Sequence, residues 1–95
     1  MKLENLPGGD LVAKGLRDLV DGRETPEAFL VAVGAARLRR AGVDVPAGAD
    51  AIDSPEHRLY ELLEAHYESA AHGRYNALVR RLVSFERAAE HAASR

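Results

Sequence analysis

The stretch TPEAFLVAVGAARLRR, residues 25–40, decides the fold. Thr25 can cap a helix through its hydroxyl, and Pro26 fits the first helical position because its missing N–H has no helical partner there. Residues 28–36 are then apolar or small all round, which is typical of a helix buried on most sides. Basic residues and a helix-ending glycine close the run: Arg37, Arg39, Arg40 and Gly42. We therefore predict a helix over 25–41 at the centre of the fold.

The next helix along the chain has the same start. Ser54, Pro55 and Glu56 repeat the cap, the proline and the acidic first turn. A stripe at helical spacing follows, made of Leu59, Leu62, Leu63, His66, Tyr67 and Ala70. The pattern predicts a helix over 55–68. The Gly-, Pro- and Asp-rich residues 42–53 then form the longest loop.

On the N-terminal side, the pattern predicts a helix over 10–21. Asp10 follows the helix-breaking run Pro7-Gly8-Gly9 and is a candidate N-cap. Its apolar residues at helical spacing are Leu11, Val12, Leu16, Leu19 and Val20, and Gly22 is a candidate C-terminal stop. Residues 1–9 are expected to form a loose lead-in.

The C-terminal segment predicts a helix over 70–92. Its apolar residues alternate steps of four and three, which gives a heptad-like seam of Ala71, Tyr75, Leu78, Leu82, Phe85, Ala89 and Ala92. Gly73 either ends the preceding helix or lies inside this one. The fold class expected from all four helices is all-α: one domain over 1–95, a small four-helix bundle-like arrangement with helix 25–41 central. Helices 55–68 and 70–92 then form an antiparallel hairpin with opposite charges on its flanks.

Composition narrows the classes of function. The chain has 95 residues, a net charge of −2 and no cysteine. A chain of this length holds one core, and its charge does not favour a general polyanion binder. The missing cysteines exclude disulfides and thiol chemistry. Because the sequence has neither a signal-peptide pattern nor a long apolar span, we expect a cytoplasmic protein without membrane contact.

Chemical motifs do not favour an enzyme. His57 with Glu61, and Glu68 with His72, share helix faces, but such pairs are common surface ion pairs. The Glu-x-x-His pattern of bundle metal sites does not occur in the sequence. We expect no catalytic residue, metal ligand or cofactor. A metal-dependent enzyme is the least favoured of three hypotheses.

The arginines carry the second hypothesis, a nucleic-acid-associated regulator. If the helices brought them to one side, five residues would form a basic patch for phosphates: Arg37, Arg39, Arg40, Arg80 and Arg81. The same arginines also have a structural explanation. Arginine complements a helix C-terminus, and its long stem covers the flank of an apolar stripe.

Protein contacts carry the leading hypothesis. The seam of helix 70–92 is longer than helix 55–68 by about 9 Å, at 1.5 Å per residue. The uncovered part needs helix 10–21, a second copy or another protein. We expect a non-enzymatic module that acts through protein–protein interaction or self-association, with a homodimer as the favoured form. The candidate contact residues are Tyr60, Tyr67, Tyr75, Leu78, Leu82 and Phe85.

Overall fold

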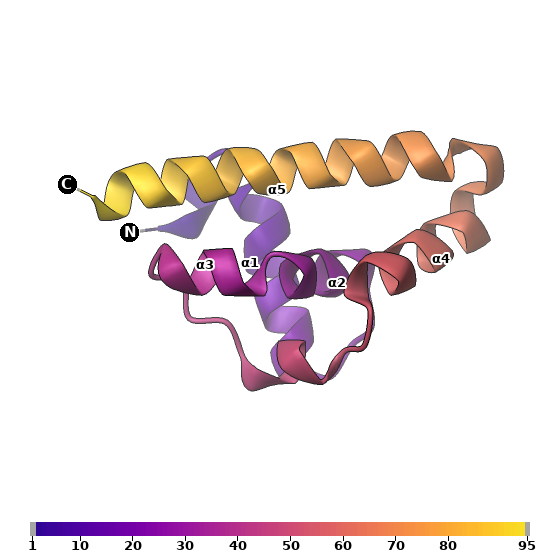
Figure 1. The fold of residues 1–95 in the computed structure, drawn as a ribbon, viewed down its shortest axis with the longest axis horizontal. Helices are drawn as coiled ribbons and strands as arrows, with labels where there is room; N and C mark the ends of the chain where they lie inside the picture. The colour runs from indigo at the N-terminus through magenta and orange to yellow at the C-terminus, as the bar shows by residue number, and fades with distance from the viewer. Residues whose placement is uncertain (1, 95) are drawn as a thin grey trace.

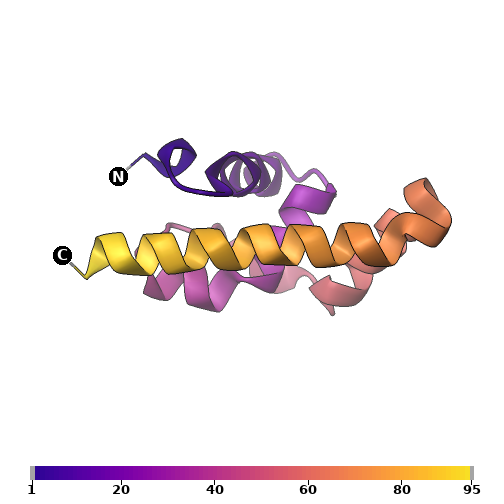
Figure 2. The same ribbon diagram turned by 90° about the horizontal axis from the view of Figure 1, so that it is seen from above.

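A computed structural model describes residues 2–94, and in this part of the chain the all-α class is confirmed (Figure 1). The α-helices are α1 (Gly9–Val20), α2 (Pro26–Val33), α3 (Ala35–Arg40), α4 (Pro55–Tyr67) and α5 (Ala71–Ala93). Short 3₁₀ turns lie at η1 (Leu3–Asn5), η2 (Ala47–Ala51) and η3 (Glu68–Ala70). The molecule measures 42 × 25 × 18 Å, and α5 runs along its longest dimension (Figure 2).

The start of α1 differs from the prediction. The helix begins at Gly9, its N-cap is Gly8 in the left-handed region, and Asp10 lies inside the first turn. The Asp10 carboxylate instead accepts a hydrogen bond from Arg81 of α5 at 2.8 Å. The expected loose lead-in is also wrong for residues 2–8, since Leu3 and Leu6 pack against the core. Residue 1 lies outside the described part. Gly9 has no Cβ, so the lead-in can fold back closely against the start of α1. A Cβ at this position would overlap the Leu3 carbonyl oxygen.

The turn between α1 and α2 follows the sequence signals. Gly22 takes the left-handed conformation, with a φ of 71°. Its N–H bonds the Leu19 carbonyl and the Arg23 N–H bonds the Asp18 carbonyl, which closes α1 as a Schellman motif. At the start of α2, the Thr25 hydroxyl accepts the Ala28 N–H at 3.2 Å. Both the stop and the cap are therefore confirmed.

The single helix predicted over 25–41 is wrong, because it is interrupted at Gly34. α2 ends before this residue and α3 begins after it. Gly34 is buried against α5, where a Cβ would lie 2.7 Å from the Glu86 carboxylate and 3.1 Å from Leu82. Glycine weakens a helix interior, and here it lets α5 approach the backbone. Residues 28–32 of α2 are all buried, as their apolar pattern predicts.

The α4–α5 hairpin turns at an unexpected residue. Ser54 has a φ of 46° and makes no side-chain cap, so that prediction is wrong, although Pro55 does open α4. The chain reverses at Glu68, whose φ is 48°. Gly73 lies inside α5, which settles where that glycine belongs. Open space surrounds the Gly73 Cα, so no packing contact forces the helix to stop there.

One core joins all five helices. Its largest fully buried side chains are Phe85, Leu30, Leu38, Leu59, Val12 and Val31. The C-terminal half of α5, which extends past α4, packs against α1, α2 and α3. Figure 1 shows α5 crossing above these helices. The expected uncovered end of the seam is therefore covered within the chain.

Candidate interaction groove

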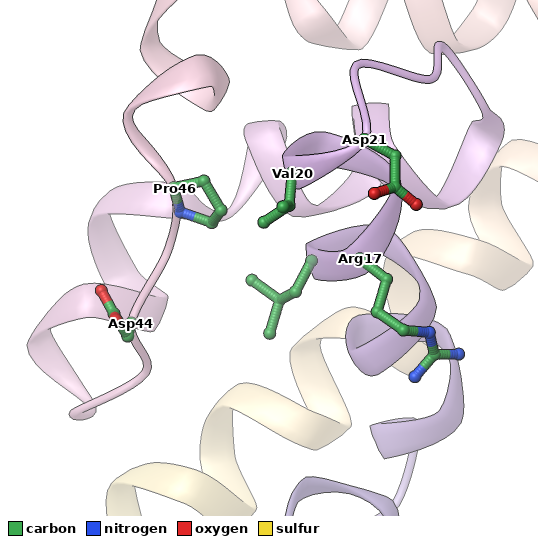
Figure 3. A pocket seen from close by; sticks show the side chains of 6 residues that line it. Arg17, Val20, Asp21, Asp44 and Pro46 are labelled. Carbon is green, nitrogen blue, oxygen red and sulfur yellow. The ribbon is translucent and has the colours of Figure 1, made fainter.

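An open groove of about 500 Å³ lies between the last turns of α1 and the loop that follows α3 (Figure 3). Its lining residues are Leu16, Arg17, Val20, Asp21, Asp44 and Pro46. Val20 stands out because 73% of its surface is exposed, although it is a large aliphatic residue. Apolar side chains from two separate segments thus share one open depression.

Helical spacing places one wall of the groove. Leu16 and Val20 are four residues apart and share a face of α1. Pro46 forms the other wall, and it is held by Arg39, whose guanidinium donates to the Val45 and Pro46 carbonyl oxygens at 3.1 and 3.2 Å. The same guanidinium binds both carboxylate oxygens of Asp50, at 2.8 and 3.0 Å. The groove is therefore preorganised on both sides.

Charges line the edge of the groove. Asp21 stands at the end of α1, where the helix dipole is negative, and Asp44 stands on the opposite wall (Figure 3). Arg17 also lines the groove, but its guanidinium points away from Asp44 in Figure 3. Arg39 lies close enough to interact with Asp44 electrostatically. The apolar side chains of the two walls, Leu16, Val20 and Pro46, together form the apolar floor of the groove. This floor between two carboxylates suits a partner that carries an apolar side chain beside a cation.

The sequence prediction missed this groove. The sequence pattern places Val20 only on the apolar face of helix 10–21, and it predicts only a loop over residues 42–53. One signal was present: α1 carries Leu11, Val12, Leu16, Leu19 and Val20, which is more apolar surface than a narrow core-facing stripe needs. Which of these residues stays exposed depends on where the loop after α3 crosses α1.

The residues predicted as an interface have different positions. Leu82 and Phe85 are 3% and 0% exposed, so they belong to the core and offer no surface to a partner. Tyr60, Tyr75 and Leu78 are half-buried in the hairpin, and the Tyr60 and Tyr75 rings lie 5.6 Å apart. Tyr67, at 42%, is the one member of the predicted set classed as exposed.

The predicted basic patch is largely taken up by ion pairs within the chain. Arg37 binds Glu90 with two hydrogen bonds, at 2.8 and 2.9 Å, and approaches Glu86 at 3.3 Å. Arg39 binds Asp50, and Arg81 binds Asp10. The other two members, Arg40 and Arg80, are exposed on different helices. Arg80 and Arg81 line a smaller groove of about 370 Å³ with Pro7 and Gly8.

Two buried carboxylates were not foreseen. Asp18 accepts hydrogen bonds from Lys14, at 2.7 Å, and from the Thr25 hydroxyl, and these two contacts lower the pKa of its carboxyl. Glu86 is buried beside Arg37 of α3, and burial raises the pKa of its carboxyl despite this nearby cation. Each carboxylate joins two helices: Asp18 links α1 to the α2 cap, and Glu86 links α5 to α3.

Among residues 2–94 the structure contains neither a metal-binding cluster nor a membrane-spanning helix. Within residues 2–94, no group of three or more potential ligands could hold a metal ion, and His57 with Glu61 is an exposed pair at 3.5 Å. None of the helices described in this range has the length and apolarity to cross a bilayer. Comparison with known proteins returned no match: no family, no curated protein and no solved structure. Function is therefore inferred from the packing and surface of this chain.

Proposed function

We propose that this chain is a non-enzymatic helical module that acts through protein contacts, by self-association at the groove beside α1. The observation that carries the proposal is Val20, a large aliphatic side chain that is 73% exposed in an apolar depression. Full burial of a valine-sized side chain is worth about 1.5–3 kcal/mol. Burial of Val20 and its neighbours by a partner would thus lower the free energy of the associated state.

The rigidity of the groove supports the same function. A binding surface costs less free energy to use when its conformation is already fixed. Here Arg39 ties the loop wall to η2, and the Schellman motif closes the end of α1 that forms the other wall. The charges at the edge can select a partner while the apolar floor supplies affinity.

The test is the solution mass across a concentration series, by light scattering coupled to size exclusion. Wild type is expected to associate at micromolar concentration, and Val20→Glu is expected to be monomeric, because a buried unpaired carboxylate opposes docking. Ala36→Glu is the matched control: it adds the same charge at an exposed helical position outside the groove, and it should associate like wild type. A wild type that stays monomeric throughout the series would overturn the proposal.

The nucleic-acid hypothesis remains as the alternative proposal, with narrower support. Its supporting observation is the smaller groove at the start of α1, which Arg80 and Arg81 line. A salt series with duplex DNA tests it, because binding through phosphates weakens steeply as salt rises. Arg80→Glu should then abolish binding. Undetectable binding at low salt would remove the hypothesis.

A further inference from the structure

Two large apolar side chains are exposed among residues 2–94: Val20 and Tyr67. They differ in the shape of their surroundings. Val20 lies in the concave groove described above, whereas Tyr67 is the last residue of α4, at the turn of the α4–α5 hairpin. Residues 64–70 around Tyr67 are all exposed, so this turn projects from the molecule. We call residues 64–74 the hairpin tip.

The hairpin tip presents an aromatic ring beside a cation. The Arg74 guanidinium, from the first turn of α5, lies 4.4 Å from the centre of the Tyr67 ring. This geometry is a cation–π contact, which at an exposed site is worth about 0.5–1 kcal/mol and favours this arrangement of the two side chains before any partner binds. Ordering side chains is one of the costs of association, and a preformed pair reduces that cost.

The chemistry of the tip matches that of the groove. An aromatic ring can cover the apolar floor formed by Leu16, Val20 and Pro46. Arg74 would then lie beside the carboxylates of Asp21 and Asp44. The tip also carries carboxylates, at Glu64 and Glu68, and the groove carries one cation, Arg17, on its outer edge. Each surface therefore offers one cation and two carboxylates, so a docked pair can form ion pairs at two cations, Arg74 of the tip and Arg17 of the groove.

Within one molecule the two surfaces lie apart. Figures 1 and 2 show the α4–α5 turn at one end of the longest dimension, whereas the groove lies between α1 and the loop after α3. The tip of a chain therefore projects away from its own groove. A second copy of the chain is an occupant that brings an exposed aromatic ring with a cation beside it.

From this match we infer that the hairpin tip of one copy docks into the groove of the next, with Tyr67 on the apolar floor and Arg74 beside Asp21 and Asp44. The inference rests on the proposed self-association and specifies its partner surface. Such a contact is heterologous, because it joins two different patches. Each added copy leaves one groove and one tip unoccupied, so the assembly grows into a chain or closes into a ring.

The closing experiment uses two variants that disable opposite surfaces. Val20→Glu blocks the groove and keeps the tip, while Tyr67→Ala truncates the tip and keeps the groove. Each variant alone is expected to be monomeric by light scattering. Their equimolar mixture is expected to form a dimer of one copy of each, because one intact tip then meets one intact groove. Helical circular dichroism and thermal melts of both variants establish that they are folded.

Three results would overturn the inference, and they differ in what they leave standing. If Val20→Glu is monomeric but Tyr67→Ala associates like wild type, the groove is the contact and the tip is not, so the proposed function survives alone. If both variants are monomeric and their mixture stays monomeric, the contact is not tip-to-groove. If wild type itself is monomeric, the proposed function fails together with the inference.

A charge exchange gives a second, independent readout. Arg74→Glu should weaken association by about tenfold or more, which corresponds to about 1.4 kcal/mol. Combining Arg74→Glu with Asp21→Arg and Asp44→Arg in one chain should restore part of the affinity, because every tip-to-groove contact then carries the exchanged charges. Absence of any restoration would contradict the assigned pairing of Arg74.

Discussion

The two halves of α5 carry the same apolar seam but lie in different surroundings. In the C-terminal half, Leu82, Phe85 and Ala89 are buried, because α1, α2 and α3 pack around them. In the N-terminal half, Ala71 is buried at the start of the helix, but the larger Tyr75 and Leu78 are half-buried, and α4 is the helix that accompanies them. The spacing of a seam therefore shows which face of a helix is apolar, but the elements opposite it decide how deeply each part is buried.

The two halves also differ in how far apart in the sequence their contacting residues lie. In the covered half, Arg37 and Glu90 are 53 residues apart in sequence, and Asp10 and Arg81 are 71 apart. The tip is held by contacts within the hairpin, such as Arg74 on Tyr67. We expect the covered half to carry most of the stability and the tip to tolerate substitution. Substitutions at Phe85 and Tyr67 test this division directly.

The largest effect is expected at Phe85. Phe85→Ala should lower the free energy of unfolding by about 3–5 kcal/mol, because it leaves a cavity at a fully buried position. Urea titration of wild type and variant measures the loss. Tyr67→Ala is the matched control at the tip and should change stability by about 0.5 kcal/mol or less. Comparable losses at both positions would refute the division of α5 into two halves.

The next effect compares two helical glycines. A Cβ at Gly15 would lie 2.4 Å from the Glu27 carbonyl oxygen and 2.5 Å from Val31, so α1 and α2 would have to separate. Gly15→Ala should cost up to about 3 kcal/mol. Gly73→Ala meets open space in α5 and should stabilise the protein by up to about 1 kcal/mol. Thermal melts of the two variants show the sign of each change in stability. A lower melting temperature for Gly73→Ala would contradict the open space found around that position.

A smaller loss is expected at Asp18. Asp18→Ala removes the acceptor of the Thr25 hydroxyl and of Lys14, and it should cost about 2 kcal/mol. Asp18→Asn keeps an acceptor oxygen for Thr25 and should retain part of that stability. Equal unfolding midpoints for the two variants would show that Asp18 acts through its charge rather than through the hydrogen bond.

The smallest effect concerns the response to acid. The pKa of Asp18 is lowered in the folded state, so its contribution is present above about pH 4 and is lost as pH falls through the folded pKa. Glu86 has the opposite sign: its pKa is raised, so its contribution is present at low pH and is lost as pH rises through the folded pKa. Acidification therefore costs the protein the contribution of Asp18 but restores that of Glu86.

Glu86→Gln isolates this opposite contribution. The variant lacks the stability that protonation of Glu86 restores, so it should lose more stability than wild type between about pH 7 and pH 4. Urea titrations at the two pH values measure the difference. An equal loss in both proteins would mean that Glu86 is as well solvated in the folded chain as in the unfolded one.

The sequence alone determined the helices, because the signals that start and stop them are local. Thr25 and Gly22 act on backbone groups within a few residues, and the apolar period needs no knowledge of the partner. Predictions from local signals were wrong where a segment distant in the sequence contacts the helix. Gly34 interrupts its helix against α5, and Asp10 bonds Arg81 rather than capping α1.

The exposed and buried surfaces were decided by the tertiary structure. Val20 and Phe85 look alike in the sequence, as apolar residues on the faces of their helices. Phe85 is enclosed because segments far apart in the chain converge on it, and Val20 stays exposed because the loop after α3 passes beside it without covering it. Periodicity records which face of a helix is apolar, while burial depends on contacts between distant residues, which no local pattern specifies.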